Sequence, residues 1–200
     1  MVKRFGEGII LAFVLIWVAA CGSGATSSGS RSADENDPSG KDYDYLHQHN
    51  AVLLNGKTVR WPSTSVTVSG ATSGSWRRAI GRWPEVNFIF VDTDAEIDLR
   101  YAHSDDWCGR ADRRFDSSGM IYGCTVRIST RHERNGCGVE ADTVTHEVGH
   151  CIGFHNETHD GGIMDLTTAG SSEITTPVRE MISLLYALPV GHDVTSRLAN

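Results

Sequence analysis

The chain has 200 residues, which allows one folded domain with short appendages. Acidic residues outnumber basic residues by 25 to 18, and the formal net charge is −7. This balance argues against a nucleic-acid partner, and because the acidic residues are spread along the chain there is no acidic tail.

Residues 1–20 have the pattern of a secretory signal peptide. A basic pair at 3–4 precedes a run of twelve apolar residues at 9–20, which is too short for a membrane-spanning helix of about 20 residues. The run ends in Val-Ala-Ala and is followed by Cys21. This ending resembles a bacterial lipobox, which implies that Cys21 is lipidated and anchors an exported protein to the outer membrane or the cell surface. Cleavage after Ala20 without lipidation is the alternative.

Residues 22–40 are rich in serine and glycine and contain almost no apolar residue. Such a segment cannot form a core, so we expect a flexible tether. We assign 21–50 to the lipidated cysteine and the linker, and 51–200 to a single folded domain that we expect to be monomeric.

Four elements are predicted in the first half of this domain. Residues 59–68 have the pattern of a strand, 75–83 that of a helix ending before a proline, and 86–91 and 96–101 those of two more strands. Aromatic and aliphatic residues lie at helical spacing in the helix, so we expect them to pack it against a sheet.

Four cysteines remain in the domain, namely Cys108, Cys124, Cys137 and Cys151. An even number of cysteines in an exported chain predicts disulfide bonds. Sequence order favours Cys108 with Cys124 and Cys137 with Cys151, which is one of three arrangements. Free thiols and a zinc site are the alternatives, although no C-x-x-C pair supports zinc.

The sequence H-E-x-x-H at 146–150 carries the clearest chemistry. Positions four apart share one face of a helix, so His146 and His150 can bind one zinc ion. Glu147 follows the first ligand and can act as the general base on a water whose pKa the zinc lowers. Gly153 ends the helix with a turn that would let a third ligand reach the metal.

This motif resembles the signature of the metzincin clan of zinc endopeptidases, H-E-x-x-H-x-x-G-x-x-H followed by a methionine turn, and most closely the matrixins. Met164, in Gly-Gly-Ile-Met-Asp, matches the methionine turn. The resemblance spans roughly residues 60–187 and implies a catalytic Zn²⁺ ion. It also implies an α+β fold with a mixed twisted sheet, an upper helix, an active-site helix, and a small C-terminal subdomain with the methionine turn and a closing helix at 176–186.

The third zinc ligand departs from the metzincin pattern, because Asn156 occupies the position of the family's third histidine. His155 stands one residue earlier. We favour His155 as the third ligand beside His146 and His150, because imidazole binds zinc much better than an amide oxygen does. Asn156 and His159 are the alternatives.

In matrixins the strand that matches 119–128 is a sheet edge that pairs with the substrate, and such pairing recognises the peptide backbone. The resemblance therefore implies a protein or peptide substrate in an extended conformation. Loop carboxylates are candidate Ca²⁺ ligands without EF-hand spacing, namely Asp105, Asp106, Asp112 and Asp116.

Two functions fit these observations. The first is a zinc metalloendopeptidase that hydrolyses peptide bonds of extracytoplasmic proteins. The second is a lipid-anchored, non-catalytic binding protein that keeps a metzincin-like fold. Glu147 favours the enzyme, because a binding protein needs no base beside its zinc.

Overall fold

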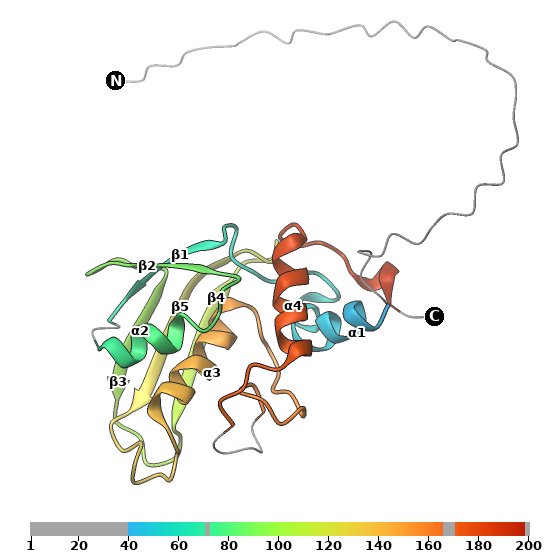
Figure 1. Cartoon of the computed structure of the whole chain (residues 1–200). Coiled ribbons are helices and arrows are strands. Elements are labelled where there is room, and N and C mark those ends of the chain that lie inside the picture. Colours follow the sequence, from blue (N-terminus) through green and yellow to red (C-terminus); the bar gives the residue numbers. More distant parts are fainter. Residues whose placement is uncertain (1–39, 71–72, 166–170, 199–200) are drawn as a thin grey trace, which may run out of the picture. The chain divides into compact units, whose positions relative to one another are not determined.

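The computed structural model describes residues 40–70, 73–165 and 171–198. Within them the chain has an α+β fold with one five-stranded sheet and four α-helices (Figure 1). The elements in chain order are α1 (Gly40–His49), η1 (Ala51–Leu54), β1 (Ser65–Ser69), α2 (Gly74–Ile80), β2 (Asn87–Phe90), β3 (Ile97–Ala102), β4 (Gly109–Phe115), β5 (Ile121–Ser129), α3 (Glu140–Ile152), α4 (Thr176–Ala187) and η2 (Thr195–Arg197). The predicted signal peptide and Cys21 lie outside the described residues.

The sheet is mixed, with the strand order β2-β1-β3-β5-β4. The pairs β1–β2, β1–β3 and β3–β5 are parallel, and β4 and β5 are antiparallel. The expectation that the strand at 119–128 is the sheet edge is therefore wrong, because β5 lies between β3 and β4. The edge is β4.

The sequence pattern did not predict β4, for a physical reason. Its inward positions include Gly109 and Ala111, which are too small to read as an apolar face, and Gly109 lies directly against α3. Charged residues such as Arg110 and Asp112 occupy the alternate positions. A strand with small inward residues and charged outward residues shows no hydrophobic alternation.

Helices α2 and α3 pack on each other over the same face of the sheet (Figure 1). The predicted packing role of the helix at 75–83 is confirmed, since its four apolar positions, Trp76, Ala79, Ile80 and Trp83, are buried. The indole N–H of Trp83 also donates to the backbone carbonyl of Thr145 at 3.0 Å. This contact ties α3 to the end of α2.

Helix α1 lies within the segment 21–50 that the sequence assigned to the linker. Tyr43 and Leu46 are buried, and α1 packs against α4 (Figure 1). The folded part of the chain thus includes α1, whose many polar residues hid its amphipathic pattern. No helix in the described ranges is long and apolar enough to cross a membrane.

The four cysteines form two disulfides, Cys108–Cys137 and Cys124–Cys151, with Cα atoms 5.5 and 5.7 Å apart. The predicted pairings of Cys108 with Cys124 and of Cys137 with Cys151 are both wrong. Cys124 lies opposite Arg113 in the β4–β5 pair, and Arg113 is five residues along the chain from Cys108, which directly precedes β4. At about 3.3 Å per strand residue the two cysteines are roughly 16 Å apart, which no disulfide can span. Cys124 instead faces α3 and meets Cys151.

Candidate metal centre

Helix α3 presents the two motif histidines on one side. Its apolar residues Val144, Val148, Cys151 and Ile152 are fully buried in the core. His146 and His150 lie on another face and are half-buried. Gly153, with φ of 143°, ends the helix in a conformation that L side chains rarely adopt. The chain therefore turns sharply, back over the histidine face.

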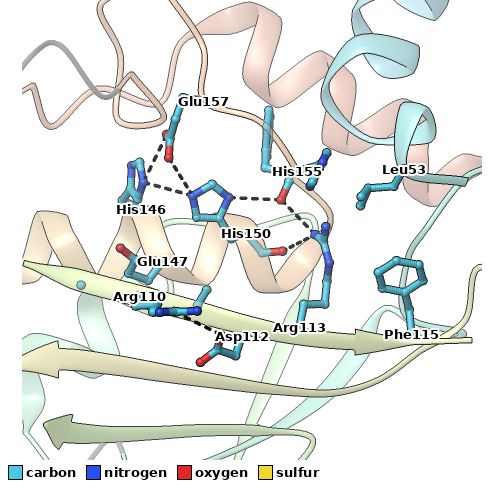
Figure 2. Close-up of a pocket in the computed structure, with 13 residues that line it drawn as sticks. Leu53, Arg110, Asp112, Arg113, Phe115, His146, Glu147, His150, His155 and Glu157 are labelled. Carbon is cyan, nitrogen blue, oxygen red and sulfur yellow. Dashed lines mark hydrogen bonds and ion pairs between the residues drawn. The ribbon is translucent and has the colours of Figure 1, made fainter. Parts of the chain in front are cut away.

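The turn brings Glu157 onto the two histidines (Figure 2). The Nε2 atoms of His146 and His150 are 3.1 Å apart, and each lies 3.3 Å from one carboxylate oxygen of Glu157. All three ligand atoms lie within 4.8 Å of one another. In the described part of the chain this is the one cluster of His, Cys, Asp or Glu with metal-binding geometry.

Backbone carbonyls hold the outer nitrogen of each imidazole. His146 Nδ1 lies 2.7 Å from the carbonyl oxygen of Ile163, and His150 Nδ1 lies 3.2 Å from that of Phe154. Because a carbonyl oxygen can only accept, Nδ1 must carry the proton in both rings. In the neutral form that binds a metal, the lone pair of each ring is then on Nε2, which points into the cluster.

Charge interactions in the cluster are strong. Burial lowers the pKa of His146, but the carboxylates of Glu157 and Glu147 outweigh it and raise that pKa to about 9. Burial raises the pKa of Glu157, but contacts with His146 and His150 outweigh it and hold that pKa at about 2. The carboxylate is therefore ionised beside the imidazoles, as a ligand must be.

Glu147 lies between α3 and the edge strand and is 7% exposed. Burial raises the pKa of its carboxyl group, while the nearby His150 and His146 oppose the shift. The backbone N–H of Ala111 in β4 donates to it. A Cβ atom at Gly109 would lie 2.6 Å from Glu147 Oε1, so only glycine leaves room for this side chain.

Residues 48–50 hold the turn between α3 and Glu157. The side chain of Asn50 donates to the carbonyl of Gly153 at 2.7 Å. The backbone N–H of His155 donates to the carbonyl of His49 at 2.6 Å. The segment that follows α1 thus sets the path of the loop that bears Glu157.

The structure does not bring the sequence-predicted third ligand to the other two. His155 is exposed, and partial desolvation of its ring, together with the charges of Arg113 and His150, lowers its pKa. Asn156 is exposed and its side chain donates to the carbonyl of Gln48 at 3.1 Å.

His159 is also exposed. The metzincin pattern does not predict Glu157 as a ligand, because the family position holds Asn156 and the nearest histidine is His155. The signal in the sequence is a carboxylate four residues after Gly153.

Met164 is fully buried against α3. A Cβ atom at Gly149 would lie 2.5 Å from its sulfur, so the methionine fills the space against the helix between the two histidines. Its neighbour Ile163 supplies the carbonyl that anchors His146. The segment around Met164 therefore supports the cluster of His146, His150 and Glu157 from the side of α3 that faces the core.

Three of the four candidate calcium ligands have other partners in the structure. Asp112 forms ion pairs with Arg110 and Arg127, and Asp105 pairs with Arg131 at 3.2 Å. Asp116 accepts hydrogen bonds within its own loop, and Asp106 belongs to no metal-binding cluster of the described residues.

A cleft of about 550 Å³ runs from the cluster of His146, His150 and Glu157 along β4. Its walls are residues 109–113 and Phe115 of the edge strand, His146, Glu147 and His150 of α3, and Leu53, Phe154, His155 and Glu157 (Figure 2). The cluster, a buried carboxyl group and an open sheet edge thus meet in one cavity. No protein-family model and no curated protein matches this chain.

Proposed function

We propose that this protein is a zinc-dependent endopeptidase of metzincin type that cleaves extended polypeptides. The observation that carries the proposal is the position of Glu147, a buried carboxyl group between a two-histidine, one-carboxylate cluster and the edge of a sheet. The helix-ending Gly153 and the buried Met164 beneath the histidines support the metzincin assignment.

The donor set fits zinc. Two imidazole nitrogens and one carboxylate are a ligand combination found in catalytic zinc sites, which keep one position open. Glu157 Oε2 is buried and makes no hydrogen bond of good geometry, only the ion contact with His146. A buried acceptor without a donor is costly, and a cation in the cluster would relieve that cost.

A bound zinc ion would lower the pKa of a water molecule and polarise a peptide carbonyl. The chain supplies the proton transfers through Glu147. As a carboxylate it accepts the proton of the attacking water, and as the acid it returns that proton to the leaving amine. Its raised pKa suits both roles, because the group then gains and loses a proton closer to neutral pH.

The open edge of β4 suits an extended substrate. In the described residues β4 pairs with β5 on one side, and its other side faces the cleft. A peptide that adds to this edge is recognised by its backbone N–H and carbonyl groups. Substrate recognition thus falls to β4 and not to the strand at 119–128.

Removal of the metal should abolish cleavage. We expect the purified protein to contain one zinc ion per chain by elemental analysis and to digest casein or gelatin. Dialysis against a chelator should stop digestion, and added zinc should restore it. Digestion that survives complete loss of zinc would contradict the proposed function.

The N-terminal pattern and the disulfides support an exported lipoprotein. Two disulfides are expected in an oxidising compartment and are rare in the cytosol. We expect the mature protein to sediment with membranes and Cys21→Ser to release it or block its processing, while Ser23→Ala has no effect. Unchanged membrane association of Cys21→Ser would rule out the lipid anchor at this cysteine.

A further inference from the structure

Arg113 is a basic side chain of β4 that reaches the end of α3. Its Nη1 atom donates to the backbone carbonyl of His150 at 2.5 Å and to that of Phe154 at 2.9 Å (Figure 2). One carbonyl is in the last turn of the helix, and the other follows Gly153. A single guanidinium group therefore joins the helix end to the turn that leads to Glu157.

The surroundings of Arg113 explain why it binds carbonyls. No carboxylate in the described ranges forms an ion pair with it, and its Nε atom is buried without a hydrogen-bond partner. A partly buried cation needs compensation. The C-terminal end of a helix carries partial negative charge, so the carbonyls at the end of α3 supply it.

The carbonyl of Phe154 has a second contact, with His150 of the candidate metal centre. It accepts from Arg113 and also lies 3.2 Å from His150 Nδ1. Arg113 thus holds the Phe154 carbonyl in place, and that carbonyl in turn orients the imidazole of His150. His146 is held differently, because its Nδ1 meets the carbonyl of Ile163, which Arg113 does not contact.

We propose that Arg113 is a positioning residue of the metal centre, which acts through the Phe154 carbonyl to orient His150 and to hold the turn that delivers Glu157. This inference rests on the proposed function only in so far as the cluster binds a metal. Removal of Arg113 leaves His150 with a mobile acceptor and leaves the turn attached by fewer hydrogen bonds. The ligands remain present, but their geometry is no longer fixed.

The test compares Arg113→Ala and Arg113→Lys with Arg114→Lys in the full chain. Arg114 is the matched control, because it lies next along β4, is exposed and stacks its guanidinium over Tyr122. Zinc affinity is measured by competition with a chromophoric chelator. We expect Arg113→Ala to bind zinc roughly 10- to 100-fold more weakly, the range typical of lost outer-shell partners. Arg113→Lys should fall between Arg113→Ala and the parent, and Arg114→Lys should match the parent.

A second readout separates positioning from simple support of the fold. Co²⁺ is added to saturation and the visible absorption spectrum, which reports ligand geometry, is recorded together with the melting temperature of the metal-free protein. We expect Arg113→Ala to have an altered cobalt spectrum, and Arg114→Lys to have the parental one. A parental spectrum and parental zinc affinity in Arg113→Ala would overturn the proposal, even if its melting temperature is lower.

If Arg113→Ala does not fold, Arg113→Lys decides the question by the same two readouts. Parental values in Arg113→Lys would then overturn the role of the guanidinium. A parent chain that binds neither zinc nor cobalt would contradict the proposed function itself. If the parent chain binds metal and the Arg113 variants bind it equally well, only the role of Arg113 is contradicted.

Discussion

Glu147→Gln is expected to retain zinc and to lose most of its peptidase activity. Glutamine keeps the shape of the side chain but cannot take a proton from water, and a positioned general base contributes about 10²- to 10⁴-fold. Zinc should stay bound because Glu147 is not one of the three clustered ligands. Cleavage of a fluorogenic peptide and zinc content would be measured on the same sample.

The control for this experiment is Glu180→Gln, which changes an exposed glutamate of α4 that does not line the cleft. Its activity should equal that of the parent. Because Glu147 is buried, a neutral glutamine should not lower the melting temperature, so lost activity cannot be blamed on unfolding. Full activity in Glu147→Gln would show that another group is the base.

Glu157→Ala is expected to weaken zinc binding more than any other change in the loop after α3. It removes one of three clustered ligands, and we expect a loss greater than the roughly 100-fold that an outer-shell change costs. Activity should fall with it. His155→Ala should change the zinc affinity by no more than a few-fold, since that side chain is exposed and outside the cluster.

The hypothesis drawn from the sequence predicts the opposite ranking of these two variants. Zinc affinities of Glu157→Ala, His155→Ala, Asn156→Ala and His159→Ala, measured under one set of conditions, decide between them. Severe loss in His155→Ala with little change in Glu157→Ala would restore His155 as the third ligand. Loss in His159→Ala alone would move the ligand to the later part of the loop.

The short-range features of this protein follow from its sequence. The apolar stripe of α3 and the four-residue spacing of its histidines predict one buried face and one face that carries both histidines, and the structure has both. The strands β2 and β3 and the packing helix α2 were likewise predicted close to their observed positions. Each depends on side chains a few residues apart, whose relative direction is set by the period of a helix or a strand.

Only the tertiary structure decided which distant residues meet. The edge position of β4 depends on the strand order, which local alternation does not encode. The disulfide partners depend on the register of β4 and β5, which moves Cys124 away from Cys108 and towards Cys151. The sequence pattern also did not predict β4 and α1, because both contain many small or polar residues. The burial of these two elements comes from neighbours far along the chain.

The proposed third ligand, Glu157, is the clearest example of the same limit. The sequence shows that the chain turns at Gly153, but His155, Asn156, Glu157 and His159 all follow within one short loop. The direction of each side chain depends on the hydrogen bonds that hold the loop from residues 48–50 and from Arg113. Those partners are about 40 or 100 residues away in the chain. Local spacing therefore predicts the helix and its two histidines, and the long-range contacts place Glu157 beside them.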